Sequence, residues 1–193
     1  MTATADTINR SAWSVDQRVE FLAGFMGLTQ EDIDTIHEFA PALASHAPAL
    51  VNAVYVKLFS NDLTKRHFMT RGAGYEGPLP EKLDDLTLDH PQILMRKQHL
   101  GAYLGRLVTS QYDSKMNAYL DMVGKIHTAK AGSPDVVIPL VQMNALMGFV
   151  HDALIGLIFS LPAPECRRVA LARAFTKLLW IQGDLISRHY TPN

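Results

Sequence analysis

The chain has 193 residues, of which 48% are hydrophobic and 19% are charged. This composition is typical of a globular protein and excludes the collagen, coiled-coil and disordered classes. Lys and Arg number 18 against 19 Asp and Glu, which gives a net charge of -1. Because no run of like charge supplies the positive field that nucleic acid or anionic lipid requires, we expect neither as a partner.

At this length we expect one domain over residues 1–193, with residues 1–12 as a flexible N-terminal segment and a core large enough to enclose a cofactor. The longest apolar run, Ala153–Phe159, is far shorter than the ~20 residues that cross a bilayer, so we expect no membrane helix. The single cysteine, Cys166, excludes an internal disulfide and a thiolate metal cage. Without a secretion signal at the N-terminus, these features predict a cytoplasmic protein.

Apolar residues recur at helical spacing along the chain, and no segment alternates as a strand does, which predicts an all-α fold. We expect a first amphipathic helix around Val15–Met26 and a second that opens with a Thr29 and Asp32 capping box. The chain is expected to restart as a new helix at Ser45–Pro48. A short polar helix over about Asn61–Met69 follows.

The second half of the chain begins with a Gly- and Pro-rich stretch, Arg71–His90, which predicts a long loop with a single helical turn. Pro91 suits the first residue of a helix to about Thr109, because a proline there loses no hydrogen bond. Asp113 is expected to cap a helix to about Gly132. The pair Ser133-Pro134 resembles a further cap, before helices that end near Leu161 and Tyr190.

A histidine lies on the apolar face of the helix predicted from Asp113. Apolar residues recur there at positions i, i+3, i+4 and i+7, ending at Val123, and the next position on the same face is His127. The histidine is therefore expected to face the core. It is either an ordinary hydrogen-bonded core residue or a ligand.

Two other apolar faces complete a candidate pocket. Tyr55 lies on one, and the late helix from Pro139 presents Met143, Leu146 and Met147 on another. A wide apolar pocket with one imidazole and one phenol suits haem, whose iron takes a neutral imidazole on one face and a gas on the other. The alternative is that the tyrosine and the methionines only pack the core.

Four stretches resemble the protoglobins and the related globin domains of bacterial globin-coupled sensors: NAVYVKLFSND, RKQHLGAYLGRLVTSQYD, LDMVGKIHTAKAG and PLVQMNALMGF. The resemblance covers nearly the whole chain, including the segment before the first globin helix. It implies a globin fold with an extra N-terminal helix, and a haem b at which dioxygen, carbon monoxide or nitric oxide binds reversibly.

By the same resemblance, His127 is the proximal iron ligand and Tyr55 the distal residue, with Leu100 and Tyr103 on the distal side. Val54 stands where the family typically has tryptophan, and Leu100 and Leu146 stand where it has phenylalanine. With the pocket residues above, the expected haem contacts are Tyr55, Leu100, Tyr103, Val123, Met143, Leu146 and Met147.

The remaining polar candidates are weaker. Arg96 lies one turn before Leu100 and could reach a haem propionate, but we expect it to point into solvent. His99 is expected at the rim or surface. His37 follows Asp34 like half of a di-iron motif, but no Glu-x-x-His occurs.

Three functions are compatible with these residues. A gas carrier or stand-alone gas sensor is favoured over a haem enzyme that acts on nitrite, reactive nitrogen species or peroxide, and over a helical interaction protein without haem. The enzyme would need a distal acid or base besides Tyr55, for which Arg96 and His99 are the candidates.

The last two predicted helices are apolar around most of their circumference, which predicts a homodimer that buries them against their symmetry mates. We expect this interface to contain Ile158, Phe175, Leu178, Leu179 and Trp180. The alternative cover for this face is the loop Arg71–His90.

Overall fold

The structure, a computed structural model, describes residues 13–131 and 137–190 and is helical in its regular parts. No strand occurs in these ranges, which confirms the all-α prediction. The expectations for residues 1–12 and for Ser133-Pro134 lie outside the described residues. The helices are α1 (Val15–Met26), α2 (Gln30–Phe59), α3 (Asp62–Lys65), α4 (Pro91–Thr109), α5 (Ser114–Lys125), α6 (Leu140–Ser160) and α7 (Glu165–Ser187), with 3-10 turns η2 (Arg66–Met69), η3 (Leu83–Asp85) and η4 (Ala129–Ala131).

Local signals set the starts of several helices where the sequence predicts them. The Thr29 hydroxyl accepts from the Asp32 N–H while the Asp32 carboxylate accepts from the Thr29 N–H, so α2 opens with the expected capping box. Pro91 is the first residue of α4. An Asp113 side-chain oxygen caps the first turn of α5. The loop between η2 and α4 contains η3, the single helical turn expected there.

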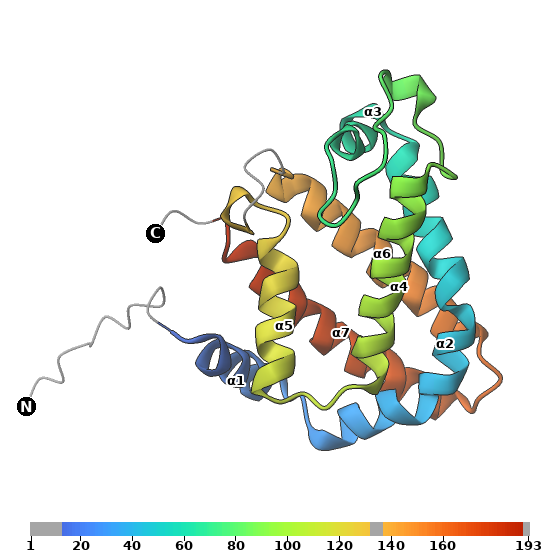
Figure 1. Ribbon diagram of the computed structural model, residues 1–193. Coiled ribbons are helices and arrows are strands. Elements are labelled where there is room, and N and C mark those ends of the chain that lie inside the picture. Colours follow the sequence, from blue (N-terminus) through green and yellow to red (C-terminus); the bar gives the residue numbers. More distant parts are fainter. Residues whose placement is uncertain (1–12, 132–136, 191–193) are drawn as a thin grey trace, which may run out of the picture.

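The predicted break at Ser45–Pro48 is wrong, because α2 continues through Pro41 and Pro48 to Phe59. Each proline lacks the N–H that would bond to the carbonyl four residues earlier, and such a loss bends a helix rather than ending it when its apolar face stays packed. Both prolines are exposed, whereas Leu43 and Val51 remain buried on the inner side. Figure 1 shows the resulting bend of α2 around the other helices.

The helix predicted to reach Gly132 is shorter, since α5 ends at Lys125 and is followed by η4. His127 thus lies in the turn just after α5. The end of α5 is held against α7 at Gly124, where an added Cβ would come within 2.8 Å of the Leu185 carbonyl oxygen. Only glycine permits so close an approach between the two helix backbones.

The main core surrounds α7, which packs against α1, α2, α5 and α6 and runs behind α4 and α5 in Figure 1. A second group of buried residues, here called the Tyr55 cluster, gathers at the other end of α2. It consists of Val51, Val54, Tyr55, Phe68, Leu86 and Ile93.

The helices α4 and α5 stand apart, because α4 packs mainly on α2 while α5 packs on α7 and α1. Figure 1 shows them separated along most of their length. They meet through the rings of Tyr103 and Tyr119, whose centroids are 6.4 Å apart. The Tyr55 cluster and His127 lie beyond this contact, toward the start of α4 and the end of α5.

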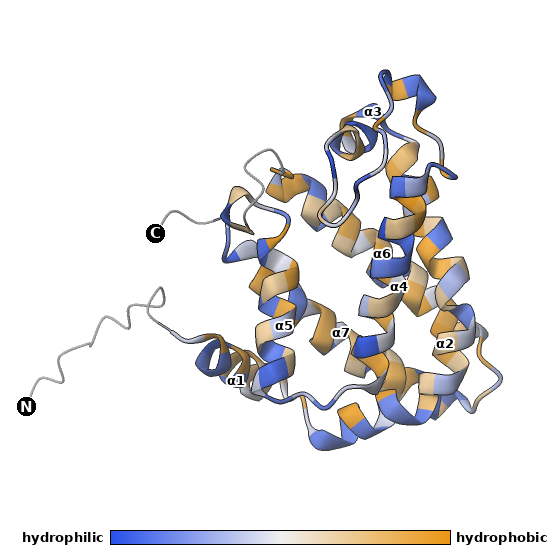
Figure 2. Ribbon diagram, in the orientation of Figure 1, coloured by the Kyte–Doolittle hydropathy of each residue, from blue (hydrophilic) through white to orange (hydrophobic). Residues whose placement is uncertain are grey.

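Both α2 and α6 are long and apolar enough to cross a membrane by length and composition alone. Figure 2 shows α6 coloured mostly orange and pale along its length. The interface expected for a dimer needs correction here, because the structure buries four of its residues inside the chain's own core. These are Ile158, Phe175, Leu178 and Leu179, whereas Trp180 is 67% exposed.

Candidate haem site

Tyr55 is buried near the end of α2, with its ring centroid 5.7 Å from that of Phe68. Leu100 of α4 and Leu146 of α6 pack against the Tyr55 cluster. Three of the expected haem contacts, Tyr55, Leu100 and Leu146, are therefore close together. The Tyr55 hydroxyl has no hydrogen-bond partner among the described residues. Burial raises the pKa of Tyr55 to about 12, although the nearby Arg96 guanidinium acts in the opposite direction. The phenol is therefore neutral and able to donate.

The loop Arg71–His90 packs onto the Tyr55 cluster through Leu86, which is 1% exposed. It is anchored by Gln92, a fully buried residue in the first turn of α4. The Gly72 N–H donates to Gln92 Oε1 at 2.7 Å, and Gln92 Nε2 donates to the Phe68 carbonyl at 2.7 Å. Sequence reasoning missed Gln92 and Phe68, since no local pattern predicts a contact between these distant segments.

His127 follows the end of α5, whereas Tyr55 lies on α2 and Arg96 on α4. In a continuing helix its backbone N–H would bond to the Val123 carbonyl, but that N–H donates to Gly124 instead. The ring replaces it, because Nδ1 lies 2.7 Å from the Val123 oxygen. A carbonyl only accepts, so Nδ1 carries the proton and Nε2 keeps its lone pair.

Four half-buried histidines bond through Nε2 to partners on other segments, whereas Nε2 of His127 has no partner among the described residues. His90 is also half-buried, but its Nδ1 accepts from the Gln92 N–H and does not donate to a carbonyl. Burial, helped by Arg96 and opposed by the Val123 carbonyl, lowers the pKa of His127 below its ordinary 6.5. A neutral imidazole with Nδ1 bonded to a backbone carbonyl is the usual form of a metal-binding histidine. The four histidines bonded through Nε2 are His37, His67, His151 and His189.

Arg96 does not point into solvent, and the structure overturns that expectation. Its guanidinium lies over the Phe68 ring, with Cζ 5.2 Å from the ring centroid. Nη2 is 3.5 Å from the Thr70 carbonyl, at the limit of a hydrogen bond, and Nε is buried without a partner among the described residues. The loop that Gln92 holds forms this environment, which explains why periodicity along α4 did not predict it.

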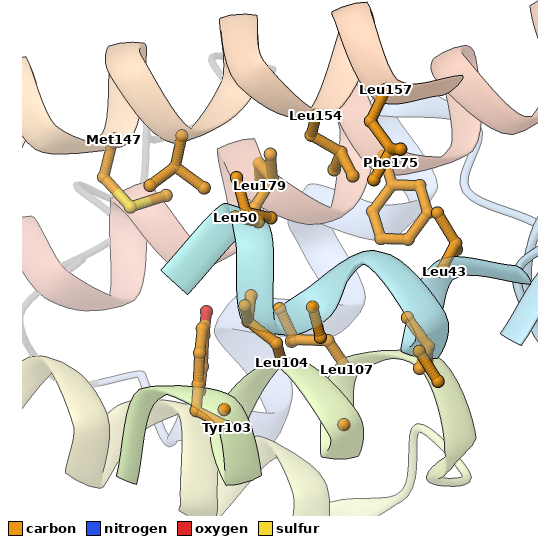
Figure 3. A pocket seen from close by; sticks show the side chains of 16 residues that line it. Leu43, Leu50, Tyr103, Leu104, Leu107, Met147, Leu154, Leu157, Phe175 and Leu179 are labelled. Atoms are coloured by element: carbon orange, nitrogen blue, oxygen red, sulfur yellow. The ribbon is translucent and has the colours of Figure 1, made fainter. Parts of the chain in front are cut away.

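The other expected haem contacts lie close by but are not all in one group. Met143 is buried on α6, and Val123 is half-buried on α5, where its carbonyl binds the His127 ring. Tyr103 and Met147 line an apolar cavity of about 240 Å³. Figure 3 shows that, among its labelled side chains, only Met147 sulfur and Tyr103 oxygen interrupt a carbon lining.

This cavity is formed by α2, α4, α6 and α7, and its lining includes neither a residue of α5 nor His127. Leu104 and Val150 line it and also pack against the Tyr55 cluster, so the cavity adjoins that cluster.

The remaining histidine candidates have other roles. His99 is exposed on α4, at the surface as expected. His37 Nε2 lies 2.9 Å from the Ser110 carbonyl oxygen. No group of three or more His, Cys, Asp or Glu side chains that could hold a metal ion occurs within residues 13–131 and 137–190.

The residues present fit a haem. His127 offers one imidazole nitrogen, apolar side chains of α4 and α6 border the Tyr55 cluster, and Tyr55 and Arg96 each keep a donor without an acceptor. Of these two donors, Arg96 Nε is buried, and a buried donor without a partner costs about 1–3 kcal/mol, which a guest with an acceptor would offset.

Comparison with solved structures identifies the fold class. The structure is similar to the globin domain of the Geobacter sulfurreducens globin-coupled sensor, with a TM-score of 0.68 and 20% sequence identity, over 90% of this chain and 97% of that chain. The fold is therefore a globin fold. The Protoglobin family profile matches residues 15–193, and no curated protein matches the chain. This chain belongs to the protoglobin family and is a globin-type haem protein that binds gases.

Proposed function

We propose that this protoglobin binds dioxygen, carbon monoxide or nitric oxide reversibly at a haem b, as a carrier or a stand-alone gas sensor. His127 holds the iron through Nε2, and Tyr55 faces the gas on the opposite side. The observation that carries the proposal is the His127 ring, whose Nδ1 donates to the Val123 carbonyl and whose Nε2 has no partner among the described residues. The haem iron supplies the coordination position for the gas.

Different residues of the chain then act on the His127 side and on the Tyr55 side of the proposed haem. The Val123 carbonyl fixes the tautomer and orientation of the His127 ring. Tyr55 donates a hydrogen bond to the gas, which favours polarised dioxygen over carbon monoxide. The apolar cavity beside Tyr103 and Met147 suits a small uncharged ligand. Leu100 and Leu146, at the border of the Tyr55 cluster, keep water from this side.

The test is the absorption spectrum of the purified protein, compared with that of two histidine variants. His127→Ala removes the proposed ligand, so haem content should fall, and added imidazole should restore the Soret band. The matched control is His99→Ala, which removes an exposed histidine of α4 and should keep the wild-type spectrum. Full haem content and an unchanged Soret band in His127→Ala would contradict the assignment.

A second candidate is a haem enzyme acting on nitrite, reactive nitrogen species or peroxide. It is favoured by one observation, the position of Arg96, whose cation lies beside Phe68 and the Tyr55 phenol rather than in solvent. A cation and a donor at the gas side are the groups that such chemistry needs.

We also propose a homodimer through α6 and α7 and a cytoplasmic location, which suits a chain whose single cysteine can form no internal disulfide. The support is the apolar surface that α6 and α7 leave exposed. Ala145 and Gly148 are exposed small residues of α6 that allow a partner helix to approach closely. The large exposed apolar residues on these helices are Val141, Phe159, Val169 and Trp180.

A further inference from the structure

Two hydrogen-bond donors lack an acceptor in the part of the candidate site that Tyr55 and Arg96 occupy, here called the Tyr55 side. The Tyr55 hydroxyl and Arg96 Nε have no partner among the described residues, and both side chains lie on the same ring, Phe68, at 5.7 Å and 5.2 Å. Lys97 lies near Tyr55 as well, but its ammonium is bound to Asn52. Arginine has only donors, and a neutral phenol needs an acceptor for its proton.

The loop beside Arg96 offers its guanidinium few hydrogen-bond acceptors. The carbonyl of Thr70 is 3.5 Å from Nη2, and the α-carbon of Gly72 faces the fork of the guanidinium, where an added Cβ would lie 2.9 Å from both Nε and Nη2. A carbon atom accepts no hydrogen bond. The guanidinium is thus held in a partly buried position by packing, while its charge is not neutralised by a carboxylate within the described residues.

We propose that Arg96 makes the Tyr55 side of this protein a binding site for small anions that coordinate the haem iron, such as azide, fluoride and nitrite. The proposal rests on the haem function above and adds a ligand class to it. An anion offers the acceptors that both Arg96 and Tyr55 lack. Charge-assisted bonds from a guanidinium are also stronger than neutral ones.

The test is a titration of the ferric, haem-loaded protein with azide and with fluoride, followed by the Soret shift. Arg96→Leu should weaken both affinities about tenfold or more. Carbon monoxide affinity of the ferrous protein should change much less, because that ligand is neutral. The matched control is Arg106→Leu, which removes an exposed guanidinium of the same helix, stacked 4.4 Å over the Tyr119 ring, and should leave both anion affinities unchanged.

A second variant covers the case in which Arg96→Leu fails to fold. Gly72→Ala keeps the charge but pushes the guanidinium away from its present position, so it should also alter azide affinity at unchanged haem content.

The outcomes are distinct. Equal anion affinities in wild type, Arg96→Leu and Gly72→Ala, with haem bound, overturn the inference and leave the gas-binding proposal intact. Loss of haem from Arg96→Leu with unchanged anion affinity in the loaded fraction also overturns it, because Arg96 would then bind a haem carboxylate. A wild-type chain that takes up no haem overturns the proposed function and this inference together.

Discussion

The backbone N–H of Gly72 donates to the side chain of Gln92 across the space between the long loop and α4, at 2.7 Å. The same side chain donates to the Phe68 carbonyl, also at 2.7 Å. These two bonds fix the start of the long loop and also η2, which carries Phe68 against Tyr55 and Arg96. A single buried glutamine therefore links the long loop, η2 and α4 beside Tyr55.

Replacing this glutamine by an apolar residue of similar size should destabilise the fold. In Gln92→Leu, the Gly72 N–H and the Phe68 carbonyl lose their partners while buried, and each such group costs about 1–3 kcal/mol. We expect the free energy of unfolding, measured with urea, to fall by about 2 kcal/mol or more. Gln98→Leu, at an exposed position of the same helix, should change it by less than about 0.5 kcal/mol. Equal stabilities of the two variants would contradict this account.

Removing the Tyr55 hydroxyl should speed dioxygen release from the haem-loaded protein. A lost hydrogen bond of about 1–2 kcal/mol predicts a roughly tenfold increase in the off-rate of Tyr55→Phe, with a much smaller effect on carbon monoxide. Because burial raises the pKa of Tyr55 to about 12, the effect should be the same at neutral and mildly alkaline pH. Flash photolysis and stopped-flow mixing measure both rates.

The control is Tyr75→Phe, whose hydroxyl donates to Pro78 within the loop. Its dioxygen off-rate should match that of the wild type. Identical off-rates in Tyr55→Phe and Tyr75→Phe would show that Tyr55 does not reach the gas.

The ion pair of Asp32 and Lys177 should make the free energy of unfolding depend on pH in the acidic range. Burial alone would raise the pKa of Asp32, but Lys177 and the Thr29 N–H lower it below its ordinary 3.8. The folded chain thus holds fewer protons at this site than the unfolded chain, and stability rises with pH in this range. The contribution of Asp32 to the free energy of unfolding is fully present above pH 3.8. It is lost as the pH falls through the lower pKa that Asp32 has in the folded chain.

Unfolding measured at several acidic pH values checks this dependence. Asp32→Asn should be less stable than the wild type near neutral pH, and the difference should shrink as the pH falls. Glu31→Gln, at an exposed position in the same helical turn, should keep the wild-type acid dependence. A constant difference between Asp32→Asn and wild type over this range would contradict the assignment.

The proposed dimer depends on the exposed face of α6 and α7. Trp180→Asp places a charge at a residue that is 67% exposed and should give a species of monomer mass in sedimentation at micromolar concentration, with an unchanged haem spectrum. Phe25→Asp, at an aromatic residue of α1 that is 84% exposed, should leave the dimer intact. If only Phe25→Asp dissociates the dimer, or if the wild type is a monomer, the interface assigned here is wrong.

Sequence reasoning succeeds where the signal is local. The Thr29 and Asp32 capping box and Pro91 mark helix starts by interactions within a single turn, so their positions follow from a few residues. The end of α5 was predicted too late because the His127 ring, rather than the next backbone N–H, binds the Val123 carbonyl. Apolar periodicity does not reveal where a side chain takes the place of a backbone N–H in binding a helix carbonyl.

Tertiary packing explains the other differences. The bend at Pro41 and Pro48 does not divide α2, because Leu43 and Val51 on its inner face stay packed on either side. The position of Arg96 depends on a loop that is far away in sequence. Tyr55 and His127 could be selected as candidates because each continues an apolar face, and the family resemblance then gave them roles.

At Gly124 the helices α5 and α7 touch through their backbones, without a side chain between them. A contact of this kind cannot adjust by rotating a side chain, so it ties the end of α5 to the last turn of α7. The carbonyl that orients the His127 ring belongs to the residue just before Gly124. The His127 ring is therefore oriented by a segment that is fixed to α7, the helix on which Trp180 is exposed.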